Sequence, residues 1–145
     1  MLLAQGEAER LIAVPKKFVS AGAVTLPPGV NRELAAECDD PVERFIVDVR
    51  RSGATLHLKH REQLRARRII VLLRLCVDGP PHTNPDGTAV GRRHLHVYRK
   101  GYEDRFAEPV DPKDFPNLSD VCSTAIDFCR YCNVTNIPTF SPTLI

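Results

Sequence analysis

The sequence predicts an α+β fold: a twisted, mainly antiparallel sheet of about five to seven strands, with a C-terminal helix and, at the N-terminus, a candidate second helix. Two patterns indicate this. Between residues 32 and 109, several segments alternate apolar and polar residues with period two, which is typical of half-buried strands. Between residues 122 and 132, apolar residues recur at helical spacing, which indicates a helix packed on the sheet.

Length and composition indicate one globular domain. The chain has 145 residues, 43% of them hydrophobic and 26% charged, so it can build a core without metal or disulfide cross-links. We expect one domain over residues 1–138 and a loosely held tail over residues 139–145. No apolar run approaches the ~20 residues of a transmembrane helix, and the charged N-terminus argues against a signal peptide, so we expect a cytoplasmic protein without membrane contact.

The elements can be placed in chain order. A short amphipathic helix over residues 2–12 ends before Pro15, which pushes the preceding residue out of the helical conformation. The expected strands cover residues 32–38, 43–51, 54–60, 69–77, 93–99 and 104–109. Residues 69–77 are apolar on both faces for most of their length, so we expect the central strand there. Ser52-Gly53 predicts the hairpin turn into the strand over residues 54–60.

Two further segments complete the prediction. Residues 78–87 form a long connection, and its Asn84-Pro85-Asp86-Gly87 sequence is typical of a type I turn. The C-terminal helix begins with Asn117 or Ser119 as its N-cap.

The charge is unevenly distributed. Residues 41–75 contain nine Lys and Arg against three Asp and Glu, and residues 91–105 contain five against two, although the whole chain is only +2. A basic middle of this kind attracts a phosphate backbone or an acidic partner. In the basic run 59–68, Arg67 and Arg68 are candidate phosphate contacts, and the alternative for this run is a solvated turn between strands.

The five cysteines predict no disulfide framework, because their number is odd and a cytoplasmic compartment is reducing. Cys129 and Cys132 form a C-x-x-C near the end of the predicted helix, away from the helix N-terminus that activates redox pairs. Cys38 and Cys76 are isolated from each other in the sequence, so no zinc site is evident. We expect buried, structural cysteines.

The histidines carry the clearest functional signal. All five fall within forty residues of the basic middle: His57, His60, His82, His94 and His96. Period-two geometry places His94, His96 and Tyr98 on one face of a strand, and it places Leu95, Val97 and Arg99 on the other face. The proline-rich connection that carries His82 and Asp86 returns to the start of this strand and can fold over it.

Three interpretations of this cluster stay open. The first is a transition metal held by His94 and His96 with His82 or Asp86. The second is metal-free phosphoryl chemistry, with one histidine as base and another as acid. The third is a polar interface for another macromolecule, without catalysis.

Two known strand motifs resemble the H-x-H pattern without fitting it. The cupin motif places its glutamate closer than Glu103 lies to His96, and histidine-triad hydrolases have a third histidine where this chain has Tyr98.

The loop Asp78-Gly-Pro-Pro-His-Thr-Asn-Pro-Asp-Gly87 and the strand His94-Leu-His-Val-Tyr-Arg-Lys-Gly-Tyr102 resemble an uncharacterised family of small bacterial and phage proteins. The motifs that define the resemblance are D-G-P-P-H-x-N-P-D-G and H-x-H-x-Y-R-x-G-Y, and the similarity spans about residues 11–138. It brings no established activity. It implies a stand-alone protein from the mobile genes that carry toxins, defence factors and inhibitors.

We therefore expect a small bacterial or phage protein that acts on nucleic acid, in its sharpest form an endoribonuclease-like toxin or defence factor. The catalytic candidates are His82, His94, His96 and Tyr98, and the substrate-binding candidates are Arg67, Arg68, Asp86, Arg92, Arg93 and Arg99. We expect no cofactor, with a transition metal at His82, His94 and His96 as the alternative. The alternative function is a non-enzymatic protein–protein module that resembles an inhibitor or antitoxin.

Overall fold

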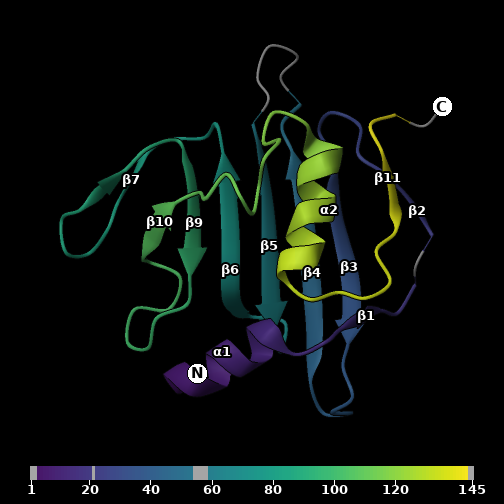
Figure 1. The fold of residues 1–145 in the computed structure, drawn as a ribbon, viewed down its shortest axis with the longest axis horizontal. Coiled ribbons are helices and arrows are strands. Elements are labelled where there is room, and N and C mark those ends of the chain that lie inside the picture. Colours follow the sequence, from purple (N-terminus) through teal and green to yellow (C-terminus); the bar gives the residue numbers. More distant parts are fainter. Residues whose placement is uncertain (1–2, 21, 54–58, 144–145) are drawn as a thin grey trace.

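A computed structural model describes residues 3–20, 22–53 and 59–143, and it confirms the α+β prediction (Figure 1). Within these residues the two helices are α1 (Gln5–Ala13) and α2 (Val121–Tyr131). The main sheet is antiparallel throughout, in the order β1 (Lys17–Phe18), β3 (Asn31–Glu37), β4 (Arg44–Arg51), β5 (His60–Ala66), β6 (Ile70–Val77), β9 (Arg93–Val97) and β10 (Ala107–Pro109). Two small sheets pair β2 (Ala23–Thr25) with β11 (Thr139–Ser141) and β7 (His82–Thr83) with β8 (Ala89–Val90).

The strand after the first long hairpin lies later in the chain than the sequence predicts. The prediction was residues 54–60, of which 54–58 lie outside the described residues, and β5 instead runs from His60 to Ala66 through the predicted basic turn. The residues of β5 do alternate between the two faces, but two of the inward positions are His60 and Glu62. Because buried positions are normally apolar, these polar residues hide the period-two pattern.

The C-terminal region differs from the prediction at two points. The N-cap of α2 is Asp120, rather than Asn117 or Ser119, and its carboxylate accepts hydrogen bonds from the backbone N–H groups of Cys122 and Ser123. Residues 139–141, predicted as part of a tail, form β11, which pairs in parallel with β2 and buries Phe140. This contact joins two segments more than a hundred residues apart, so no local pattern could predict it.

One side of the sheet packs against the helices. In Figure 1, α2 crosses in front of β4 and β5, and the apolar stripe of the helix joins the inward residues of these strands in a single core. The core includes Val47 of β4, Leu64 of β5 and Phe128 of α2, each with no exposed surface. The opposite side of the sheet carries the alternate, more polar residues of the same strands.

The buried side chain of Lys16 caps the C-terminal ends of both helices. Its fully buried ammonium donates hydrogen bonds to the carbonyl oxygens of Ile12 and Val14 at the end of α1, at 2.8 and 3.0 Å, and of Cys132 at the end of α2, at 2.8 Å. The last carbonyl groups of a helix lack intrahelical partners, and a cation suits that end of the helix dipole. Burial lowers the pKa of Lys16 to about 8.

A second buried polar group joins β5 to the segment before α2. His60 donates from Nδ1 to the Glu62 carboxylate at 2.8 Å and from Nε2 to the Leu118 carbonyl oxygen at 2.8 Å. Both side chains are buried, and burial raises the pKa of the Glu62 carboxyl group. A carbonyl only accepts hydrogen bonds, so Nε2 of His60 carries a proton, and we assign the proton between Nδ1 and Glu62 to the histidine. Burial acts to lower the pKa of His60, but the hydrogen bond and charge of Glu62 raise it above its ordinary value.

We predict that Glu62→Gln lowers the free energy of unfolding by about 3 kcal/mol near pH 6, because the buried imidazolium loses its counter-charge. The raised pKa of His60 gives stability that is fully present below its unfolded pKa of about 6.5 and is lost as pH rises through the folded pKa. The gap between the parent and variant proteins should therefore narrow as the pH rises above about 6.5. Urea unfolding at several pH values measures this gap, and a gap independent of pH would contradict the assignment.

Candidate functional site

The register between neighbouring strands gathers polar side chains on the side of the sheet opposite α2. Residues that face each other across an antiparallel pair point to the same side. Across β6 and β9, Cys76 lies opposite His94, and Arg74 lies opposite His96. The first of these rows continues across the sheet through Arg61 of β5 to Arg50 of β4.

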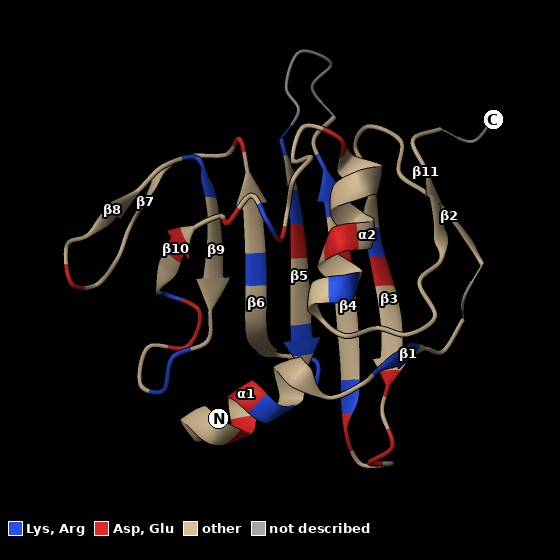
Figure 2. Ribbon diagram, in the orientation of Figure 1, with Lys and Arg blue, Asp and Glu red and all other residues tan. Residues whose placement is uncertain are grey.

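An open groove of about 700 Å³ runs over these rows and is strongly basic. Its charged lining residues are Arg50, Arg51, Lys59, Arg61 and Arg74. None of the described residues that line it is Asp or Glu. Figure 2 shows the corresponding blue segments where β4 ends and β5 begins. Arg50 and Arg61 are both exposed, and neither forms an ion pair with any residue that the structure describes.

Three histidines meet at one end of the groove. The ring centroids of His94 and His96 lie 4.9 Å apart, and His82 from β7 lies 4.7 Å from His96 and 5.7 Å from His94. The predicted convergence of these three residues is therefore present in the structure. The thiol of Cys76 joins them, with the ligand atoms of Cys76, His94 and His96 all within 4.8 Å of one another.

Each of these imidazoles is oriented by a backbone carbonyl. Nδ1 of His94 donates to the Gly91 oxygen at 2.6 Å, and Nδ1 of His96 donates to the Asp104 oxygen at 2.8 Å. Nε2 of His82 donates to the Arg105 oxygen at 2.8 Å. Because a carbonyl only accepts hydrogen bonds, these nitrogens carry the protons. The neutral rings therefore have a lone pair on the other nitrogen.

Burial keeps the two strand histidines neutral. It is the largest cause that lowers the pKa of His94, and the neighbouring His82 and Arg74 act in the same direction. Burial also lowers the pKa of His96 to about 4, with Arg74 as the next cause. Burial raises the pKa of the Cys76 thiol, whereas the charge of Arg74 acts to lower it.

Tyr98 does not join the histidines, although strict alternation predicts that it does. Strand β9 ends at Val97, and the Tyr98 amide donates to Leu72, the residue of β6 that forms a bulge between the paired positions 71 and 73. The Tyr98 side chain is buried in the core, where its hydroxyl donates to the Leu3 carbonyl oxygen and accepts from the Leu3 amide. The observed role of Tyr98 is to hold the N-terminal segment.

The predicted arginine contacts of the loop and strand lie outside the groove. Arg93 faces the other side of the sheet, opposite Val77, and forms an ion pair with Asp78 at 2.9 Å. Arg92 donates to the Gly79 carbonyl oxygen, and the guanidinium of Arg99 stacks on Phe106 at 3.8 Å.

Asp86 is exposed, and its carboxylate accepts a hydrogen bond from Thr88 within the turn. It lines a second hollow together with Arg99, away from the histidines.

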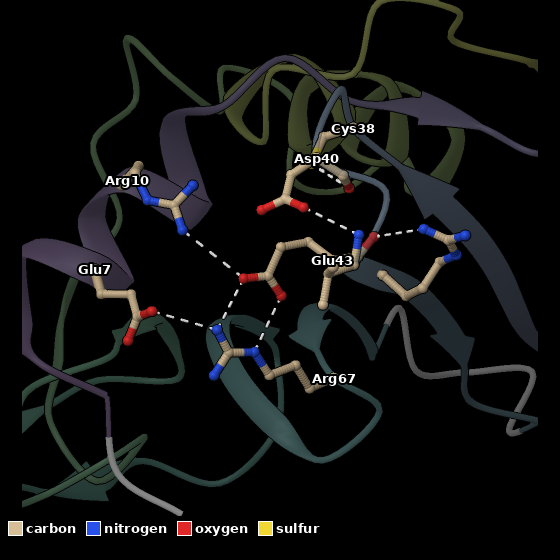
Figure 3. Close-up of polar contacts among 8 residues, drawn as sticks. Glu7, Arg10, Cys38, Asp40, Glu43 and Arg67 are labelled. Carbon is tan, nitrogen blue, oxygen red and sulfur yellow. Dashed lines mark hydrogen bonds and ion pairs between the residues drawn. The ribbon is translucent and has the colours of Figure 1, made fainter.

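Arg67 is part of a structural ion-pair cluster at the far end of the sheet (Figure 3). Its guanidinium donates two hydrogen bonds to the buried carboxylate of Glu43, at 2.8 and 3.0 Å, and also contacts Glu7 of α1. Arg10 of α1 lies 3.8 Å from the same Glu43 carboxylate. The cluster therefore ties α1 to two hairpins of the sheet. Arg68 is exposed beside it, and no contact brings it to the groove.

The prediction missed the groove residues of β4, β5 and β6. Arg74 and Cys76 are the two polar residues at alternating positions in an apolar strand, a pattern that could have indicated the face of β6 turned away from the core. For Arg61 no such signal existed, because the basic run gave no indication of the strand it belongs to. The sequence analysis expected buried, structural cysteines. In the structure Cys76 is half-buried, and the neighbouring strand β9 brings His94 and His96 beside it.

Comparison with known families assigns the chain to a class without a known activity. The chain belongs to the family described as "family of unknown function (DUF6978)", which matches residues 3–134. Neither curated proteins nor solved structures give a match. In the described part of the chain, no helix has the length and apolar character needed to cross a membrane.

We predict that Arg67→Ala lowers the free energy of unfolding by roughly 1–3 kcal/mol, because the buried Glu43 carboxylate loses both of its short hydrogen bonds. The same variant should keep any ligand affinity of the groove unchanged, since Arg67 lies at the other end of the sheet. Denaturant unfolding and a binding assay on one preparation separate the two effects. If folded Arg67→Ala lost affinity for the groove ligand, Arg67 would have to be part of the ligand-binding site, and the prediction would be wrong.

Proposed function

We propose that the protein binds single-stranded nucleic acid, with the phosphate backbone in the basic groove. The observation that supports this most directly is the pair Arg50 and Arg61, which lie opposite each other on adjacent strands without an acidic partner in the described residues. Like charges in this arrangement destabilise a sheet. A polyanionic ligand would neutralise the two charges. The arginine pair does not stabilise the fold, so ligand binding is the better explanation for it.

The rest of the groove fits the same ligand. Lys59 and Arg51 extend the positive charge along it, and charge of this kind attracts phosphates without regard to base sequence. The half-buried ring of His82 at one end of the groove offers a flat surface on which an unpaired base can stack. An acidic protein would also be attracted to the charge, but it would not need an aromatic ring beside the groove.

Cleavage of the bound strand, as by an endoribonuclease-like toxin, stays a prediction. Acid–base catalysis needs one nitrogen that accepts a proton and one group that donates it. In the described hydrogen bonds, both His94 and His96 use their protonated nitrogen to hold a carbonyl. Each of these two histidines therefore has one nitrogen that can accept a proton. Neither provides the proton-donating group that acid–base cleavage also needs.

The double variant Arg50→Gln/Arg61→Gln should lose roughly tenfold or more in affinity for a single-stranded RNA oligonucleotide near 0.1 M salt. The slope of log affinity against log salt should also become less steep by about 1.4, the value for two lost phosphate contacts. Removing the repulsion should leave the free energy of unfolding unchanged or raise it by up to about 1 kcal/mol. Fluorescence anisotropy over a salt series and urea unfolding measure these quantities.

The matched control is Arg68→Gln/Arg130→Gln, which removes the same charge from two exposed positions outside the groove. This control should bind RNA with nearly the parental affinity and salt slope. Equal losses in the two double variants would show a general charge effect. The proposal is contradicted if the parent protein does not bind RNA, or if its affinity for RNA does not depend on the salt concentration.

A further inference from the structure

The cluster of Cys76, His94 and His96 has the form of a metal site. One thiol and two imidazoles come from adjacent strands whose register places them on one side of the sheet, and their ligand atoms lie within 4.8 Å of one another. Around a four-coordinate zinc ion, such atoms lie about 3.3–3.7 Å apart. Side-chain rotations that shorten the separations by roughly 1 Å would complete the coordination.

The hydrogen bonds around the cluster are those that metal-binding histidines use. A ligand imidazole normally donates its other N–H to a carbonyl or carboxylate, which fixes the ring and leaves a lone pair for the metal. His94 donates to Gly91 and His96 donates to Asp104, each through Nδ1. Both residues therefore have Nε2 available, and both line the groove, which provides a path for an ion.

We propose that Cys76, His94 and His96 bind one Zn²⁺ ion, with the fourth coordination position turned toward the groove. A set of one thiolate and two imidazoles suits zinc, and three protein ligands leave the open position that zinc sites use to bind water or substrate. His82 lies beside this position, because its ring is 4.7 Å from that of His96.

The surrounding charges permit a cation at this point. Two basic residues share this face: Arg74 lies two residues before Cys76 in the chain and opposite His96 in the sheet, and Arg61 lies opposite Cys76. The positive charge of Arg61 favours the thiolate form of Cys76 that a metal requires. Arg74 forms a 2.6 Å ion pair with Asp104, which offsets its charge. The Cys76 thiol would lose its proton when it binds the metal, and the resulting thiolate neutralises one of the two charges of the ion.

The site also gives the groove a chemical function that the histidines lack without metal. A zinc ion at the end of a phosphate-binding groove polarises an oxygen in its open position, either of water or of a phosphate group. Zinc binding does not depend on the proposed RNA binding, because none of its ligands is one of the groove arginines used to test that proposal.

The test uses the full chain, freed of metal by a chelator and kept reduced. Titration with Co²⁺ as a spectroscopic probe should give one equivalent per chain, with the visible absorption of four-coordinate cobalt and a near-ultraviolet thiolate charge-transfer band. Zn²⁺ should displace Co²⁺ and abolish both bands. Cys76→Ser should remove the thiolate band and weaken Zn²⁺ binding by about 100-fold or more, a larger loss than the roughly 10–100-fold expected for a lost second-sphere contact.

Cys122→Ser is the matched control, because Cys122 is also a half-buried free cysteine but lies on α2 outside the groove. It should bind Co²⁺ with the parental spectrum. The proposal is overturned if the parent protein binds no stoichiometric metal, or if Cys76→Ser, folded by circular dichroism, keeps the thiolate band. The Arg50→Gln/Arg61→Gln variant should still bind one equivalent of Zn²⁺ per chain, because it keeps all three ligands, so the failure of one proposal can be told from that of the other.

Discussion

The pairing register of β6 with β9 is the constraint on which the candidate site depends. With Cys76 opposite His94 and Arg74 opposite His96, four chemically active side chains point to the same side of the sheet. A shift of one residue would turn the β9 histidines to the opposite side of the sheet. Burial of the leucines on the other face favours this register. Leu75 and Leu95 lie opposite each other in the core, and a one-residue shift of β9 would expose Leu95 to the groove.

The polar groups of the core support this arrangement from the other side. Lys16 holds the ends of both helices, and the His60–Glu62 pair attaches β5 to the segment that leads into α2. Buried charges of this kind stabilise a fold only when their hydrogen bonds are complete. In the described residues every buried side-chain nitrogen and oxygen has a hydrogen-bond partner, so the polar groups of the core meet this condition.

The groove and the cysteine–histidine cluster suggest two linked properties of one surface. Arg50 and Arg61 would hold the backbone of a nucleic acid, and Cys76 with the two β9 histidines would hold a metal ion at the end of the same groove. The family to which the chain belongs has no described function, so each property stands on the geometry and on its own experiment. Together they describe a surface on which a bound phosphate could lie next to a Lewis acid.

Local sequence patterns were sufficient for the α+β class, for most strands and for the gathering of His82, His94 and His96, because strand alternation and turn chemistry act over a few residues. The tertiary structure alone decided which residues meet across strands. It brought Cys76 to the histidines, and a bulge in β6 accompanies the burial of Tyr98 in the core. Contacts of this kind depend on strand order and register, which are set by the packing of the whole chain, so a period-two pattern does not contain them.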